Sequence, residues 1–176
     1  GTEYHHVPQP PAGVPLVCDM SSDIYSRPLD VTKFGLIYAG AQKNLGAAGT
    51  TVLFIRDDML ERNARPLPTM LQYRVHAKDE SRHNTPPVFN IYLTGQVFKW
   101  IMRQGGLAAM EKRNAEKAKL IYDAIDQSGG YYKGHARADS RSLMNITFRL
   151  KSEELDTKFM AEAAKNNMID MKGHRS

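Results

Sequence analysis

The chain has 176 residues, of which 41% are hydrophobic, and its 24 Lys and Arg against 19 Asp and Glu give a formal charge of +5. This composition excludes a disordered tail, a collagen and a low-complexity linker. The longest uncharged apolar stretch, residues 35–41, is far shorter than the ~18 residues that a membrane span needs, so we expect no membrane partner.

The single cysteine, Cys18, cannot close a disulfide within the chain, and we therefore expect a reducing, cytoplasmic location. The chain begins at Gly1 and stops directly after an apparent helix. We interpret both ends as cuts and expect an internal piece of a longer protein.

The pI near 9.3 makes nucleic-acid binding one function to consider, because Lys and Arg side chains bind phosphates. The basic residues are scattered, however, and no zinc-finger spacing, aromatic RNA-binding signature or helix-turn-helix pattern accompanies them. The densest basic stretch is Lys112, Arg113, Lys117 and Lys119, interleaved with Glu111 and Glu116. This mixture is typical of a solvated helix face, so we expect neither a nucleic-acid partner nor a metal site.

Three short apolar runs follow a proline-rich connector at residues 8–15, which cannot be helical. The runs cover residues 16–18, 34–39 and 50–55, and each is continuous rather than alternating. Continuous apolar strands are typical of a sheet that is covered on both faces, so this part of the chain predicts an α/β fold.

Helical spacing begins near residue 85. Thr85 is predicted to be an N-cap, with Pro86 at the first helical position. The pair Gly105 and Gly106 is predicted to end this helix.

The remaining chain predicts a second helix over residues 107–126, an alternating strand over residues 144–150 and a third helix that begins after Ser152. Alternating apolar residues indicate a strand that is buried on one face only. We therefore divide the chain into a first domain, residues 1–105, and a second domain, residues 106–176.

Lys43 lies just beyond the second apolar run and precedes a turn of small residues. Open α/β sheets place their ligands at the carboxyl ends of the strands, and we expect Lys43 to be buried there. Burial favours the free amine of a lysine, which can attack an aldehyde to form a Schiff base. A strand-end lysine that only extends into water is the alternative.

Asp19 holds the matching position at the end of the first apolar run. A carboxylate beside a pyridine nitrogen keeps that nitrogen protonated, and the ring can then accept electrons. Taken alone, Asp19 is better explained as a cap or turn residue that bonds to Ser21 and Ser22. Together, Asp19 and Lys43 make pyridoxal phosphate a candidate cofactor.

Asn84 and Thr85 form a third candidate element. A helix N-terminus with a hydroxyl cap binds anions, although Pro86 and Pro87 remove two N–H donors here. A helix start with no ligand is the alternative.

Several motifs occur in order along the chain: residues 19–22 (DMSS), 26–31 (SRPLDV), 38–46 (YAGAQKNLG), 84–87 (NTPP), 95–100 (GQVFKW) and 172–175 (KGHR). Together they resemble the phosphoserine aminotransferase family, within class V of the fold type I aminotransferases that depend on pyridoxal phosphate. The resemblance implies a partial cofactor-binding large domain with a mixed sheet, followed by a small, truncated α+β C-terminal domain.

The family is homodimeric and exchanges the amino group of glutamate with 3-phosphohydroxypyruvate, on the route to serine. The resemblance implies that Lys43 is catalytic, forming the Schiff base with the cofactor and moving a proton. It implies that Asp19 pairs with the pyridinium nitrogen and that Gln42 bonds to the cofactor phosphate.

The resemblance also implies roles for two further pairs of residues. Asn84 and Thr85 would reach the cofactor phosphate of the other subunit. His174 and Arg175 would lie near the anionic substrate, whose carboxylate or phosphate suits a guanidinium.

Three alternatives stay open on the sequence. One is another fold type I transaminase, which would keep Asp19 and Lys43 but act on a different amino acid. A second is a non-catalytic basic domain that binds nucleic acid. A third is a structural piece that only dimerises through the segment around Asn84. We expect the isolated piece to be inactive, because a sheet without its other strands has unpaired edges.

Overall fold

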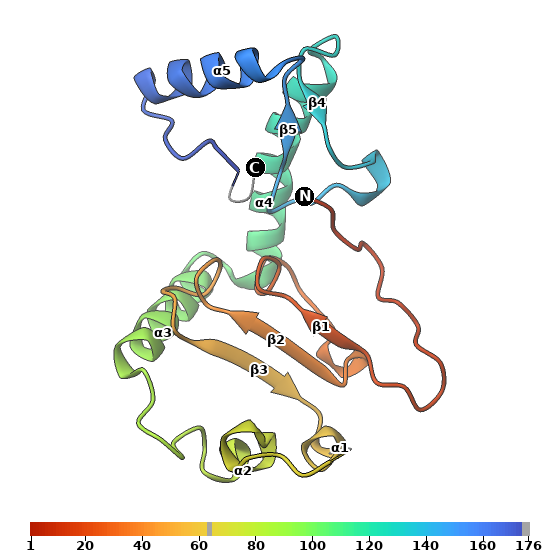
Figure 1. Cartoon of the computed structure of the whole chain (residues 1–176), viewed down its shortest axis with the longest axis vertical. Coiled ribbons are helices and arrows are strands. Elements are labelled where there is room, and N and C mark those ends of the chain that lie inside the picture. Colours follow the sequence, from red (N-terminus) through yellow and green to blue (C-terminus); the bar gives the residue numbers. More distant parts are fainter. Residues whose placement is uncertain (63–64, 174–176) are drawn as a thin grey trace. The chain divides into compact units, whose positions relative to one another are not determined.

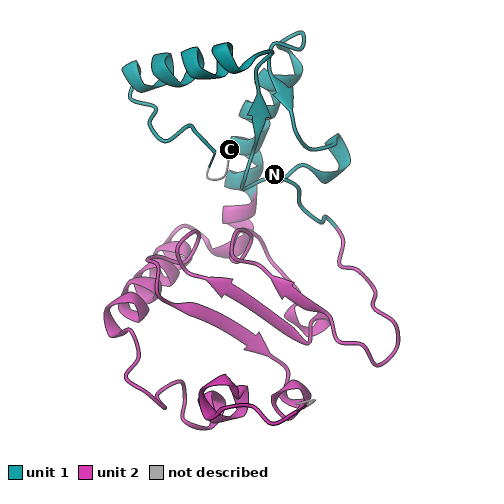
Figure 2. Cartoon of the chain, in the orientation of Figure 1, with its two compact units in different colours: residues 1–5, 112–176 teal, residues 6–111 magenta. Residues whose placement is uncertain are grey.

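The computed structural model describes residues 1–62 and 65–173, which form two compact units (Figures 1 and 2). One unit is His6–Glu111, and the other combines Gly1–His5 with Lys112–Ser176. The division of the chain at residues 105 and 106 stays a prediction.

A three-stranded mixed sheet forms the centre of the first unit, in the order β1-β2-β3. The strands are β1 (Val17–Asp19), β2 (Leu36–Gly40) and β3 (Thr51–Ile55), so all three predicted strands are confirmed. β1 pairs with β2 in parallel and β3 pairs with β2 in the antiparallel direction. The carboxyl ends of β1 and β2 therefore lie at the same edge of the sheet.

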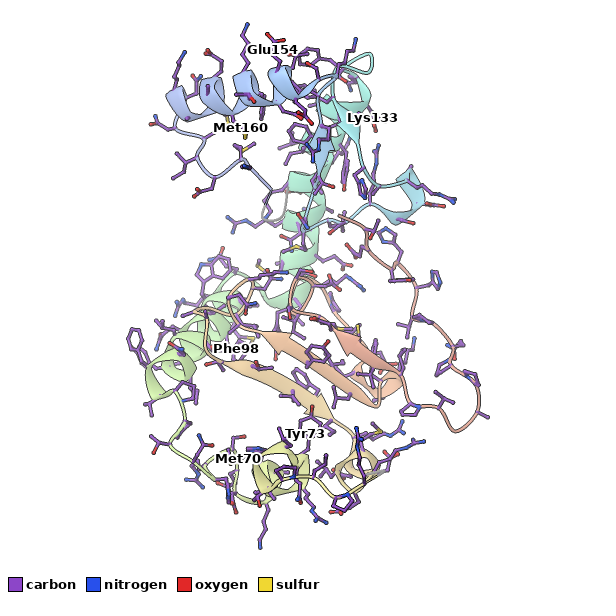
Figure 3. All side chains as sticks on the ribbon, viewed as in Figure 1. Met70, Tyr73, Phe98, Lys133, Glu154 and Met160 are labelled. Carbon is purple, nitrogen blue, oxygen red and sulfur yellow. The ribbon has the colours of Figure 1, made fainter. Side chains whose placement is uncertain are left out.

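The hydrophobic core of this unit lies on one face of the sheet. Ile37 and Ala39 of β2 are at most 1% exposed, and Phe98 of the long helix α3 (Val88–Arg103) packs against the same cluster (Figure 3). On the opposite face, Val17 and Tyr38 are exposed. Leu36 on this second face is buried at 6% exposure, so the face is covered only in part, and the predicted burial of both faces is wrong for the positions of Val17 and Tyr38.

Between β3 and α3, the residues that the structure describes form short helices and turns. These are α1 (Asp57–Leu60), η2 (Thr69–Leu71) and α2 (Tyr73–Lys78), while η1 (Val31–Lys33) precedes β2.

The predicted cap at Thr85 is wrong, since α3 begins at Val88 with Pro87 as its N-cap. Two consecutive prolines explain the shift. A residue that precedes proline is disfavoured in the helical region, so Pro86 cannot start the helix in front of Pro87. The predicted end is confirmed, because α3 stops at Arg103, before the glycine pair.

The helix α4 (Gly106–Asp126) agrees with the second predicted helix. Its basic stretch lies on an exposed face, as expected, and Lys119 forms an ion pair with Asp123 one turn later. None of the helices described, in residues 1–62 and 65–173, has the length and apolarity needed to cross a membrane.

The second unit also contains a short antiparallel sheet of β4 (Lys133–Gly134) and β5 (Phe148–Arg149), with η3 (Ala138–Ser140) between them. The predicted strand is shorter than expected, although exposure alternates along residues 144–149 as its pattern requires. The third predicted helix is confirmed as α5 (Glu153–Lys165), whose N-cap Ser152 accepts a bond from the Leu155 N–H.

Candidate functional site

The candidate site lies at the edge of the sheet where β1 and β2 end. Asp19 is the last residue of β1, and its partner in the register is Tyr38 of β2. β2 ends at Gly40, and Lys43 follows in the next turn. The topology thus brings the predicted acid and the predicted amine to one edge, each from the end of a neighbouring parallel strand.

The Asp19 carboxylate is held by the turn that follows it. Its Oδ1 accepts hydrogen bonds from the Ser21 N–H at 2.9 Å and from the Ser21 hydroxyl at 2.6 Å. The same hydroxyl oxygen accepts a bond of 3.0 Å from the Gly40 N–H at the end of β2. Ser21 therefore links the carboxylate to the neighbouring strand.

These contacts lower the pKa of Asp19. The bond from the Ser21 side chain contributes most, followed by the bond from its backbone, while partial burial acts in the opposite direction. The positive charge of Lys43 and the side chain of Tyr38 lower the pKa further. Asp19 is therefore an anion at neutral pH, and Lys43 lies within range of its charge.

Lys43 is carried by a tight turn. The N–H groups of Leu45 and Gly46 donate to the Ala41 carbonyl at 3.1 and 2.8 Å, and both Ala41 and Leu45 are fully buried. Because these two side chains point inward, the intervening Gln42 and Lys43 point outward and are exposed. The expected burial of Lys43 is therefore wrong for the described residues.

Gln42 folds back over the end of β2. A Cβ atom at Gly40 would lie 3.0 Å from the Gln42 amide nitrogen and 3.1 Å from its Cδ, with a still closer approach to Oε1. A glycine at position 40 leaves the space that the Gln42 amide occupies. The amide supplies two N–H donors at the same sheet edge, which suits an anion.

Asn84 and Thr85 are not brought to this edge by any bond that the structure describes. Both are exposed, and the Asn84 amide donates to the neighbouring Thr85 carbonyl at 3.3 Å. Within residues 1–62 and 65–173, no hydrogen bond or ion pair joins either of them to Asp19, Gln42 or Lys43. His174 and Arg175 lie outside the described residues.

Sequence reasoning gave Ser21 a role only as a turn partner of Asp19, and it assigned no role to Asn44. Ser21 was detectable, because a serine two positions after an aspartate is a common turn partner. Asn44 could not be detected in this way, because its side-chain amide donates to the carbonyls of Ser22 and Ile24, which precede β2 in the chain.

The chemistry of this edge is that of an amine, a carboxylate and an amide in one place. An exposed amine can attack an aldehyde, and an ionised carboxylate can hold a protonated ring nitrogen. These functional groups suit a ligand that is aromatic, carries an aldehyde and bears an anionic group.

Residues 5–176 match the family model described as Aminotransferase class-V. The chain is 57% identical over 176 residues to the phosphoserine aminotransferase of Lysinibacillus sphaericus, covering 100% of this chain and 48% of that relative. It is 56% identical to the protein of the same name from Herpetosiphon aurantiacus, covering 100% of this chain and 49% of the relative. The chain thus spans about half the length of the curated relatives that it matches.

Solved structures agree with these matches. The phosphoserine aminotransferase from Bacillus circulans subsp. alkalophilus has a TM-score of 0.95 and 51% identity, covering 99% of this chain and 48% of that chain. A phosphoserine aminotransferase from Trichomonas vaginalis with bound PLP has a TM-score of 0.92 and 42% identity, covering 99% of this chain and 50% of that chain.

Proposed function

Since the chain belongs to the aminotransferase class-V family, we propose that it supplies the cofactor-binding edge of a phosphoserine aminotransferase. In this reaction the amino group of glutamate passes to 3-phosphohydroxypyruvate, which yields phosphoserine and 2-oxoglutarate. The observation that carries the proposal is the placement of Asp19 and Lys43 at the ends of neighbouring parallel strands, with the charge of one acting on the other. The names of the similar proteins support the choice of substrate.

The residues at this edge fit pyridoxal phosphate. When bound, that cofactor supplies an aldehyde that takes up the amino group and a ring that withdraws electrons. Lys43 would hold the cofactor through its amine and would serve as the group that moves a proton at the substrate α-carbon. The Asp19 carboxylate would keep the ring nitrogen protonated, and the Gln42 amide would donate to the phosphate.

The cofactor-binding large domain is proposed to be residues 1–105, and the small C-terminal domain residues 106–176. The end of α3 at Arg103 supports this division. The chain also separates into two compact units, although these divide between Glu111 and Lys112 and group Gly1–His5 with the later residues. On the sequence alone, the proposal assigns His174 and Arg175 of the second domain to the anionic groups of the substrate.

The choice of substrate is tested in the full chain by comparing phosphoserine, serine and alanine as amino donors to 2-oxoglutarate. Hydrogen bonds to a charged group contribute about 1.5–3 kcal/mol each. We therefore expect kcat/KM for phosphoserine to exceed that for serine by at least roughly tenfold for each hydrogen bond to the substrate phosphate, because serine has no phosphate to accept it.

Two results would redirect this assignment. Equal rates with serine or alanine would favour another fold type I transaminase. Salt-dependent nucleic-acid binding, together with no amino transfer from any donor, would favour the non-catalytic alternative.

The full chain is proposed to act as a homodimer in which Asn84 and Thr85 reach the cofactor phosphate of the partner subunit. Their exposure supports this, as do the exposed side chains of Val88 and Phe89 at the start of α3, which are 68% and 69% accessible. Light scattering is expected to give the mass of two copies, and the mass of one copy would contradict the proposal.

A cytoplasmic location is proposed as well. The free thiol of Cys18 supports it, because cysteine thiols stay reduced in the cytoplasm and form disulfides in oxidising compartments. Cell fractionation that recovers the protein outside the cytoplasm would contradict it.

A further inference from the structure

Asn44 directly follows Lys43 and joins the turn after β2 to the turn after β1. Its side-chain amide nitrogen donates to the Ser22 carbonyl at 3.2 Å and to the Ile24 carbonyl at 3.1 Å. An asparagine amide has two N–H donors, and both are used here. The two carbonyls belong to the turn that begins at Asp19, so this amide connects the two loops that carry the candidate acid and amine.

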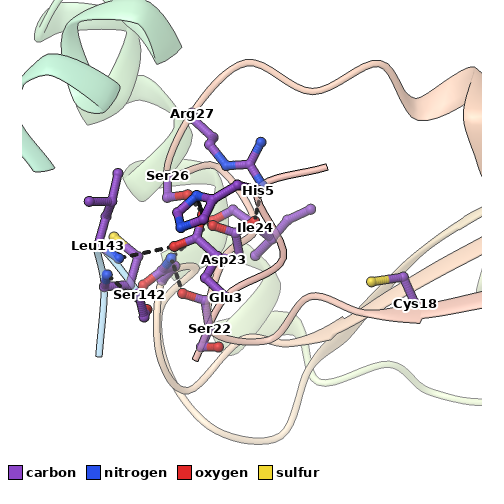
Figure 4. A network of polar contacts seen from close by, with 12 residues as sticks. Glu3, His5, Cys18, Ser22, Asp23, Ile24, Ser26, Arg27, Ser142 and Leu143 are labelled. Atoms are coloured by element: carbon purple, nitrogen blue, oxygen red, sulfur yellow. Dashed lines mark hydrogen bonds and ion pairs between the residues drawn. The ribbon is translucent and has the colours of Figure 1, made fainter. Parts of the chain in front are cut away.

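The turn that receives these bonds is itself well fixed. The Asp23 carboxylate accepts from the Ser26 hydroxyl at 2.7 Å and from the Arg27 guanidinium at 3.0 Å (Figure 4). The Tyr25 ring packs with its centroid 5.0 Å from that of Phe98 on α3. Asn44 is thus bonded to a part of the fold that is held by side-chain bonds and by the core.

The Lys43 side chain is not held in one direction by burial. Lys43 is exposed, and its flexible four-carbon chain sets no direction by itself. Its direction must come from the backbone of the turn, which Ala41 and Leu45 anchor from the core and Asn44 ties to the neighbouring loop.

We propose that Asn44 is a positioning residue, which sets the separation between the Lys43 amine and the Asp19 carboxylate by tying their two turns together. The inference rests on the proposed function, because the separation matters only if both groups meet one ligand. Its effect is on the placement of the amine rather than on the affinity for a ring and a phosphate.

Two cofactor forms separate these effects in the full chain. Pyridoxal phosphate carries the aldehyde that the Lys43 amine attacks, whereas pyridoxamine phosphate has the same ring and phosphate but no aldehyde. For Asn44→Ala we expect borohydride-trapped adduct at Lys43 to form roughly 10- to 100-fold more slowly, since a misplacement of about 1 Å costs up to that much. The affinity for pyridoxamine phosphate is expected to stay within about threefold, because every bond to the ring and the phosphate is kept.

A second variant and a matched control accompany this test. Asn44→Asp keeps the shape but replaces the donors by a carboxylate that faces two carbonyl oxygens, so it should slow the adduct at least as much as alanine. Asn166→Ala removes an amide-to-carbonyl bond of 2.9 Å to Glu162 in the other unit and should leave the adduct rate unchanged.

The outcomes distinguish this role from a merely structural one. Equal losses for both cofactor forms, or an unchanged adduct rate in Asn44→Ala, would overturn the role of Asn44. If the unsubstituted protein forms no adduct, that result would contradict the proposed function instead. The role of Asn44 is then tested without cofactor, by an NMR titration of Asp19. Because the positive charge of Lys43 lowers the pKa of Asp19, displacement of Lys43 in Asn44→Ala should raise that pKa. An unchanged pKa would refute the role of Asn44.

Discussion

Lys43→Ala is expected to abolish covalent capture of pyridoxal phosphate and to lower amino transfer by roughly 10²- to 10⁴-fold, the usual contribution of a positioned proton-transfer group. The structure gives the reason, because the exposed amine of Lys43 stands at the carboxyl edge of the sheet beside the Asp19 anion. The measurements are the visible absorbance after the cofactor is added, the mass of the borohydride-treated protein and kcat in the full chain.

Two variants complete this experiment. Lys43→Arg keeps the positive charge but not a nucleophilic amine, so it should also fail to form the adduct. Lys33→Ala removes an exposed lysine of η1 in the same unit and should change neither quantity. An adduct of unchanged mass in Lys43→Ala would remove Lys43 from its role.

Asp19→Asn is expected to lower amino transfer by about 10²- to 10³-fold, the usual cost of losing one preorganised electrostatic partner. The amide has nearly the shape of the carboxylate but cannot hold a ring nitrogen in its protonated form. The Lys43 amine is untouched, so the adduct should still form. The measurements are kcat and borohydride trapping on the same samples.

Asp30→Asn is the matched control for this substitution. The Asp30 carboxylate accepts from the N–H and the hydroxyl of Thr32 at 3.1 and 2.5 Å, which repeats the local arrangement of Asp19 and Ser21. If both variants lose activity equally, the loss comes from the turn and not from a partner of the cofactor.

The hydrogen bonds at Asp19 also predict how the charge of its carboxylate depends on pH. The Ser21 bonds hold the pKa of Asp19 below its ordinary value, so the carboxylate is present at neutral pH and is lost only as the pH falls through that lowered value. Ser21→Ala removes the largest of these bonds and should raise the pKa, so that the carboxylate is lost at a higher pH. A carbon-13 NMR titration of Asp19 measures the shift, and a lower or unchanged pKa would contradict the cause.

The strands and the pair at their ends could be predicted from the sequence because the signals are local. The first apolar run stops at Asp19 and the second ends shortly before Gln42 and Lys43, and parallel pairing then brings Asp19 and Lys43 to one edge. The capping of α5 by Ser152 was predictable for the same reason, since an N-cap is set within one turn.

Other features depend on residues far apart in the chain. The exposure of Tyr38 could not be predicted, because a continuous apolar run does not show which face of the strand lacks a packing partner. The bonds of Asn44 connect it to carbonyls that precede β2, and no local pattern marks them. The error at Thr85 differs in kind, because its cause is local: the second proline disfavours the helical conformation of the first, and the helix starts later.

The pairing of β1 with β2 makes the length of β1 matter more than its composition. Asp19 faces the same side as Tyr38, and successive side chains alternate between the two faces. Insertion or deletion of one residue ahead of Asp19 would turn its carboxylate toward the side of Ile37 and Ala39, where an unpaired charge is costly to bury. Natural variants of this chain should therefore tolerate many side chains at Val17 but no change in the number of residues that lead to the acid.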